Sequence, residues 1–181
     1  NVLRIDCGEF QMDHEVAKLI GAPPGYLGHR ETHPMLSQQK VNSVTSDRSP
    51  LSLVLFDEIE KAAPSFQRIL LGVLDRATLK LGDNTSVSFE NSLIFLTSNL
   101  GAHGMMSALR GGFGFAAGHA VAAGDRQKNL DRIGLSAVRR NFSPEFVNRL
   151  DEVVTYQPLG HKALEGILDL QIGLLRRHLE T

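Results

Sequence analysis

Two adjacent carboxylates, those of Asp57 and Glu58, follow an unbroken run of apolar residues in the segment LSLVLFDEIEK. The apolar run predicts a central strand of a parallel sheet that is buried on both faces. Open α/β sheets place their ligand sites at the carboxyl ends of such strands. Two acids at that position cost desolvation energy unless a cation or a reaction uses them. This pair is therefore the candidate chemical centre of the chain.

The arrangement is that of a Walker B motif, in which one carboxylate serves Mg²⁺ and the next acts on a water molecule. A structural alternative is that the two acids begin a helix, where the helix dipole favours negative charge. A second buried strand ends in Thr97, Ser98 and Asn99, within LIFLTSNLG. If the two strands are neighbours, Asn99 lies beside the carboxylate pair.

Strands that alternate with helical patterns predict a parallel sheet with crossover connections. The strands are expected at residues 2–5, 51–56, 92–96 and 152–156. Helices are expected to begin at Pro64 and after Ser143, and an amphipathic helix is expected at 161–179. A hairpin is expected at 79–89, and loops are expected at 21–34 and 101–124.

Composition restricts the class of protein. The 181 residues fit one domain, or one domain and a fragment of another, with 42% hydrophobic and 22% charged residues. The net charge of −1 argues against a nucleic-acid partner, since such partners are held largely by phosphate contacts. The single cysteine, Cys7, allows no internal disulfide and favours a reducing compartment. No apolar run approaches the roughly 20 residues of a membrane-spanning helix.

Four sequence segments follow one another along the chain in this order: GAPPGYLG, LVLFDEIEKA, LTSNLG and FSPEFVNRLDE. Together they resemble the second ATPase module of the Clp family, the ring-forming AAA+ unfoldases and disaggregases, over nearly the whole chain. The resemblance implies a RecA-like AAA+ P-loop NTPase fold, with a three-layer αβα core and a mostly parallel sheet. It also implies ATP and Mg²⁺ as cofactors, a cytoplasmic homohexamer, and unfolded or aggregated protein as substrate, with no nucleic acid and no membrane.

The resemblance assigns roles to four residues. Asp57 would help to hold Mg²⁺, and Glu58 would be the base that polarises the attacking water. Asn99 would orient that water or contact the γ-phosphate; the alternative is that it caps a strand end. Arg149, in FSPEFVNRLDE, would be an arginine finger for the neighbouring subunit's nucleotide. The structural alternative is an ion pair between Arg149 and a nearby acid, Asp151 or Glu152.

Two loops carry further expected contacts. Gly25, Tyr26, Leu27 and Gly28 would form a pore loop, in which Tyr26 grips the substrate polypeptide and the glycines allow bending. The segment Phe113-Gly114-Phe115 resembles the docking tripeptide of peptidase-coupled Clp ATPases, with Phe at a position that is usually aliphatic. The alternative is that both aromatic rings fold back onto the ATPase core.

The chain departs from the family in one major respect, because it contains no G-x-x-x-x-G-K-[ST] phosphate loop. In the family this loop and the first core strand precede the position of Asn1. Residues 1–181 are therefore expected to be a fragment of the large α/β subdomain, incomplete at its N-terminus. The small helical subdomain is expected to be absent or only begun at 161–181. The slot of the missing strand would be closed by the last strand, be filled by another chain, or be left open with 153–156 packed away.

Two functions remain open at this point. The chain is either part of an ATP-driven unfoldase or disaggregase, inactive without its phosphate loop, or a non-catalytic fragment that assembles or binds protein. A DNA clamp loader or initiator is disfavoured, because an aromatic pore loop has no role there.

Overall fold

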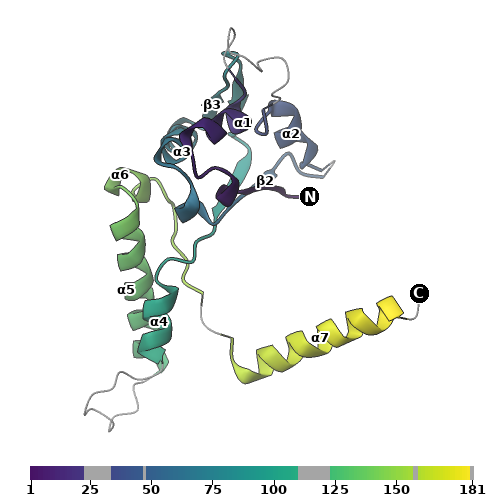
Figure 1. The fold of residues 1–181 in the computed structure, drawn as a ribbon, viewed down its shortest axis with the longest axis vertical. Coiled ribbons are helices and arrows are strands. Elements are labelled where there is room, and N and C mark those ends of the chain that lie inside the picture. The colour runs from purple at the N-terminus through teal and green to yellow at the C-terminus, as the bar shows by residue number, and fades with distance from the viewer. Residues whose placement is uncertain (23–33, 47, 110–122, 157–158, 180–181) are drawn as a thin grey trace.

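A three-stranded parallel sheet carries the candidate site. The computed structural model describes residues 1–22, 34–46, 48–109, 123–156 and 159–179 (Figure 1). The strands β1 (Leu3–Asp6), β2 (Ser52–Asp57) and β5 (Ser92–Leu96) lie in the order β1-β2-β5. Both pairings are parallel. The predicted fold class, a mostly parallel sheet with helices, is therefore confirmed, with the strand before the two carboxylates at its centre.

The side chains on one face of this sheet pack in the hydrophobic core. The register pairs Phe56 with both Ile5 and Leu96, so the three side chains share a face. Phe56 and its neighbour on that face, Val54, are fully buried. Burial on this face follows from the alternation of side chains along each strand.

The opposite face of the sheet is more open than its apolar sequence predicts. Leu53 and Leu55 on β2 are only partly buried. Leu93 and Phe95 on β5 are 48% and 52% exposed. The expectation of a central strand buried on both faces is wrong for the described residues, because the side chains on the Leu55 face keep part of their surface exposed.

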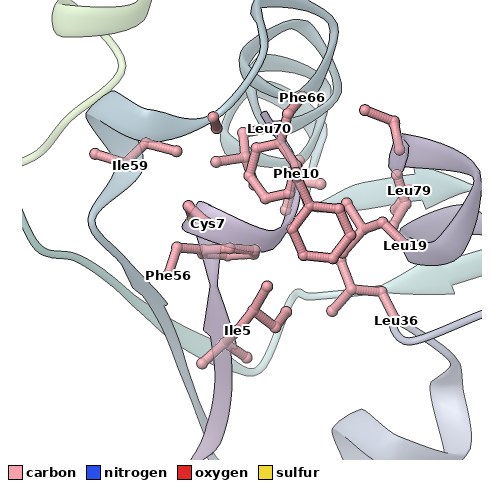
Figure 2. Close-up of a cluster of buried hydrophobic side chains, with 14 of the residues drawn as sticks. Ile5, Cys7, Phe10, Leu19, Leu36, Phe56, Ile59, Phe66, Leu70 and Leu79 are labelled. Atoms are coloured by element: carbon pink, nitrogen blue, oxygen red, sulfur yellow. The ribbon is translucent and has the colours of Figure 1, made fainter. Parts of the chain in front are cut away.

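Phe66, on helix α3 (Pro64–Arg76), packs at the centre of the core (Figure 2). Its ring lies 5.3 Å from that of Phe10 and 5.9 Å from that of Phe56, centroid to centroid. Cys7 is buried in the same cluster, and burial, followed by the nearby acids, raises its pKa to about 12. The thiol is therefore neutral and packs as a small apolar group.

Helix α3 begins and ends where its sequence predicts. Pro64 occupies the first turn, where its missing N–H costs no hydrogen bond. Phe66, Leu70 and Val73 form one buried stripe. The helix ends at Arg76, and the next residue, Ala77, caps it: its φ of 50° is left-handed and its N–H donates to the Val73 carbonyl at 2.8 Å.

The predicted hairpin is also confirmed, as the antiparallel pair β3 (Thr78–Lys80) and β4 (Ser86–Ser88). Its turn packs closely on the end of helix α1 (Val16–Ile20): the Gly82 N–H donates to the Ile20 carbonyl at 2.8 Å. A Cβ at Gly82 would lie 2.3 Å from the Gly21 carbonyl oxygen, so only glycine fits this contact.

A loop is expected at 101–124, but the structure has helix α4 (Ala102–Leu109) and the start of helix α5 (Ala123–Asn141) there, so the expectation is wrong for those residues. Residues 110–122 lie outside the described part of the chain. Helix α4 buries none of its residues and therefore shows no apolar period. It packs instead on α5 through small residues: a Cβ at Gly134 would lie 2.6 Å from the terminal methyl carbon of Met105.

The fourth predicted strand, at 152–156, is wrong. This segment pairs with none of the strands in the described residues. Thr155 instead donates a hydrogen bond to Asp131 on α5, and Val154 and Tyr156 are exposed. Residues 153–156 therefore pack away from the sheet, as one of the three expectations for this segment stated.

Helix α6 (Pro144–Val147) begins as predicted, with the Ser143 hydroxyl accepting from the Phe146 N–H at 3.2 Å. Helix α7 (His161–Leu179) is also confirmed, and Figure 1 shows it standing apart from the other elements. None of the helices in the described ranges combines the length and apolar character needed to cross a bilayer. The remaining elements are α2 (Gln38–Ser43) and the 3-10 helices η1 (Cys7–Glu9), η2 (Asp13–Glu15) and η3 (Ile59–Lys61).

The two faces of the sheet predict different costs for removing a phenylalanine ring. Phe66→Ala should lower the free energy of unfolding by about 3–5 kcal/mol, because it leaves a cavity in the core. The control Phe95→Ala, on the open face, should cost less than about 1 kcal/mol. Urea unfolding of the chain, followed by far-UV circular dichroism, measures both. Equal costs would mean that the Phe95 face is covered as well.

Candidate functional site

Strand register brings the polar ends of β2 and β5 together. Leu55 pairs with Phe95, so Asp57 and Thr97, two residues further along each strand, lie on the same face. The Thr97 hydroxyl donates a hydrogen bond to Asp57 Oδ1. The same hydroxyl oxygen accepts from the Glu58 backbone N–H at 3.0 Å. Thr97 therefore fixes both acids of the pair relative to β5.

Asp57 has a second partner on β1, the strand that lies on the opposite side of β2 from β5. Arg4 pairs with Leu55 in the register of β1, which puts its side chain on the Asp57 face, and its Nη2 donates to Asp57 Oδ2. The Thr97 hydroxyl and, after it, the Arg4 guanidinium lower the pKa of Asp57 below its usual 3.8. The carboxylate is therefore ionised at neutral pH and carries hard oxygen atoms suited to a cation such as Mg²⁺.

Glu58 has an unusual backbone conformation. Its φ of 56° and ψ of 51° lie in the left-handed region, which a non-glycine residue enters at a cost of order 1–3 kcal/mol. The conformation ends β2 and turns the chain directly into η3. Because the turn is sharp, the Glu58 side chain stays at the end of the sheet rather than continuing along it.

The Glu58 carboxylate lies between an amide and an ammonium group. Its Oε1 accepts from Asn99 Nδ2 at 2.9 Å, and its Oε2 accepts from Lys61 Nζ at 2.5 Å. The contact with Glu58 raises the pKa of Lys61. The Glu58 side chain keeps 31% of its surface exposed, so water can reach it. A carboxylate in this setting can accept a proton from a water molecule.

Asn99 lies beside the carboxylate pair, as expected if the two strands are neighbours. Hydrogen bonds hold its main chain as well as its side chain. The Asn99 backbone N–H donates to Glu60 Oε1 at 3.0 Å. The Ile59 N–H donates to the Thr97 carbonyl at 3.0 Å. Residues 97–99 and 58–60 are therefore joined by hydrogen bonds beyond the regular sheet.

The cluster does not form a closed metal site by itself. Within the described ranges, no group of three or more His, Cys, Asp or Glu side chains is arranged to hold a metal ion. Mg²⁺ is commonly bound through one or two carboxylates, with substrate phosphates and water completing its shell. The donor set around Asp57 fits that mode of binding.

Arg149 is tied to helix α3. Its Nη1 lies 2.5 Å from Asp75 Oδ1, with both side chains partly exposed. The sequence alternative named Asp151 or Glu152 as the partner, and the ion pair formed is with Asp75 instead. The structure thus does not bring Arg149 into the carboxylate cluster of its own chain.

The two predicted contact loops fall outside the described residues, both the one with Gly25, Tyr26, Leu27 and Gly28 and the one with Phe113, Gly114 and Phe115. The base of the first loop is described. There, the N–H groups of Met35 and Leu36 donate to the carbonyls of Lys18 and Leu19, each at 3.1 Å.

Four polar residues of the cluster have no role in the sequence-based prediction: Arg4, Thr97, Glu60 and Lys61. Arg4 carries a usable signal, since it is the one charged residue inside the predicted strand at 2–5. Thr97 follows its strand directly, as Asp57 does. Glu60 and Lys61 give no such signal, because their contacts depend on the left-handed turn at Glu58.

Comparison with known proteins gives consistent matches. The family model described as AAA domain (Cdc48 subfamily) matches residues 1–153. Chaperone protein ClpB of Meiothermus ruber is 37% identical over 99% of this chain and 19% of its own length. ClpB of Pseudomonas putida is 38% identical over 98% of this chain and 18% of its own length. The chain thus spans about a fifth of the length of these relatives.

Solved structures match the fold over almost the whole chain. A structure described as the S. cerevisiae Hsp104:casein complex in an extended conformation aligns with a TM-score of 0.75 and 28% identity. It covers 99% of this chain and 28% of the Hsp104 chain. A closed-state reconstruction of Hsp104 with ATPγS and FITC casein aligns over 96% of this chain and 27% of its own, with a TM-score of 0.73 and 29% identity.

Thr97→Val should raise the pKa of Asp57 towards 3.8, because the variant removes the hydroxyl that chiefly lowers it. A lowered carboxyl pKa stabilises the fold above the unfolded-state pKa, and this contribution is lost as pH falls through the folded-state value. The variant should therefore have a lower free energy of unfolding than the wild type at neutral pH. The difference between the two proteins should become smaller as pH falls below 3.8.

The measurement is an NMR titration of the Asp57 carboxyl carbon, with urea unfolding at several pH values. Thr97→Ser is the matched control, since it keeps the hydroxyl and should keep the low pKa. A Thr97→Val protein whose Asp57 titrates as in the wild type would contradict the assignment of the hydroxyl as the main cause.

Proposed function

The chain belongs to the AAA domain family (Cdc48 subfamily), and from this premise we propose that it is part of an ATP-dependent protein disaggregase or unfoldase. The full-length protein would couple ATP hydrolysis to polypeptide translocation. The observation that carries the proposal is the meeting of Asp57, Glu58 and Asn99 at the carboxyl ends of two adjacent parallel strands. The similarity to ClpB along the whole chain supports it.

Each of the three residues has a task that suits its chemistry. Asp57, ionised, would contribute an oxygen to Mg²⁺, whose charge offsets that of the phosphate oxygens when ATP is bound. Glu58 would accept the proton of the attacking water. Asn99, through its amide, would orient Glu58 and the water. Each carboxylate oxygen of Glu58 has a second lone pair, so its bonds to Asn99 and Lys61 leave capacity for a water molecule.

The cradle for the phosphates is not encoded in this sequence, which contains no G-x-x-x-x-G-K-[ST] segment. We therefore propose that these 181 residues alone do not hydrolyse ATP. A second candidate function, a non-catalytic part that assembles or binds protein, takes its support from the same absence.

Substrate and subunit contacts are part of the same proposal. Gly25, Tyr26, Leu27 and Gly28 would contact an unfolded or aggregated polypeptide in the axis of a homohexamer. Support comes from the paired hydrogen bonds that close the base of their loop and from the similar Hsp104 structures, which are described as holding casein. Phe113, Gly114 and Phe115 would be the docking site for a peptidase ring. The proposed location is cytoplasmic, in agreement with the single cysteine.

Helix α7 is proposed to begin a small helical subdomain, with the rest of the chain belonging to the large α/β subdomain. Its apolar side chains have no cover within the described residues. Those of Leu164, Ile167, Leu168 and Leu175 are all more than two-fifths exposed.

Glu58→Gln in the full-length protein should keep ATP binding and lower turnover by about 10²- to 10⁴-fold, because the amide keeps the shape of the side chain and loses the base. Steady-state hydrolysis and nucleotide titration measure the two properties. Glu90→Gln, at an exposed position, is the control and should hydrolyse at the wild-type rate. Near-normal turnover in Glu58→Gln would refute the role of the base.

Arg149 should act on the neighbouring subunit's nucleotide. Mixing Arg149→Ala subunits with Glu58→Gln subunits should restore part of the turnover, since an interface can then combine an intact Glu58 with an intact Arg149. The control mixes Arg149→Ala subunits with the double variant, which forms no intact interface and should recover nothing. If no mixing ratio restores turnover, Arg149 has only its structural role beside Asp75.

A further inference from the structure

Glu60 makes a contact that none of the assigned roles uses. It lies in η3, two residues after Glu58, and its Oε1 accepts the Asn99 backbone N–H at 3.0 Å. Its other carboxylate oxygen, Oε2, is buried and has no hydrogen-bond partner among the described residues. A buried oxygen without a partner is costly, so a carboxylate at this position needs a reason.

Asn99 has no regular secondary structure to hold it. It lies three residues past the end of β5 and before the first residue of α4, and its side chain is exposed. Its carbonyl accepts from the Ala102 N–H at 3.3 Å, and its N–H donates to Glu60, so the Glu60 bond is the one that ties its main chain to the segment that carries Glu58. A bond from an N–H group to a charged carboxylate is shorter and stronger than one to a neutral acceptor.

The contacts form a continuous path from Glu60 to the proposed base. Glu60 holds the Asn99 main chain, and the Asn99 side chain donates to Glu58 Oε1 at 2.9 Å. Glu60 and Glu58 belong to one short segment, so Asn99 is held at both ends by that segment. Any displacement of the Asn99 backbone would move its amide away from Glu58.

We propose that Glu60 is a positioning residue for the hydrolytic reaction: its carboxylate fixes the Asn99 backbone so that the Asn99 amide meets Glu58. The inference rests on the proposed function for its kinetic consequence. The Glu60–Asn99 contact is independent of that function and is tested separately.

The first experiment uses the 181-residue chain and NMR. The Asn99 amide proton should be protected from exchange with solvent deuterium, because it donates to Glu60. Glu60→Ala should remove this protection, whereas Glu58→Gln and the exposed control Glu145→Gln should retain it. Unchanged exchange at Asn99 in the Glu60→Ala variant would overturn the proposal.

The second experiment measures ATP turnover in the full-length protein. Glu60→Ala should lower kcat by about 10- to 100-fold with little change in KM, since a misplaced group costs rate rather than binding. Glu60→Gln, which keeps an acceptor oxygen of the same shape, should lose less and guards against misfolding of the alanine variant.

A double-mutant cycle decides whether Glu60 acts through Asn99. The variant with both Glu60→Ala and Asn99→Ala should lose no more turnover than Asn99→Ala alone. Losses that multiply would overturn the proposal, because Glu60 would then act independently of Asn99. If Glu58→Gln and Asn99→Ala both leave turnover at the wild-type level, the proposed function fails instead, and the NMR result on the Glu60–Asn99 contact still stands.

Discussion

The pairing of β2 with β5 is the constraint on which the candidate site depends. One hydroxyl, that of Thr97, donates to Asp57 and accepts from the Glu58 N–H, so it joins both acids to the neighbouring strand. The strands place these groups together only in the observed register. A shift by one residue would turn Thr97 to the opposite face, because side chains alternate along a strand. Core packing on the Phe56 face therefore fixes the strand register, and with it the positions of the polar side chains on the other face.

Features that depend on local pattern could be predicted from the sequence. Apolar runs identified the three strands of the sheet, proline positions identified the starts of α3 and α6, and the polar strand ends identified Asp57, Glu58 and Asn99 as neighbours. Each of these signals is contained in a few consecutive residues. Their agreement with the structure shows that the centre of this fold is encoded locally.

The failures concern features that depend on what packs against a segment. Residues 152–156 have the composition of a strand, but Thr155 bonds to Asp131 on α5 and no strand in the described residues pairs with them. Helix α4 has no apolar stripe, since it contacts α5 through closely approaching small residues. The partner of Arg149 could not be predicted, because Asp75 lies on a helix far away in sequence.

The charge balance of the site explains why so many polar residues gather around two acids. Asp57, Glu58 and Glu60 place three carboxylates within four positions, and their mutual repulsion would destabilise the turn after β2. Arg4 offsets the charge of Asp57, and Lys61 offsets that of Glu58. Glu60 faces the Asn99 N–H, a dipole rather than a cation. The two acids proposed to contact Mg²⁺ and water thus each have a cation beside them, while the third acid bonds to the backbone.

Arg4 and Lys61 both keep about half or more of their side-chain surface exposed, so the surrounding protein does not hold either side chain rigidly. Long exposed side chains form weak ion pairs, so a bound cation can take over the neutralisation of Asp57 without unfolding its surroundings.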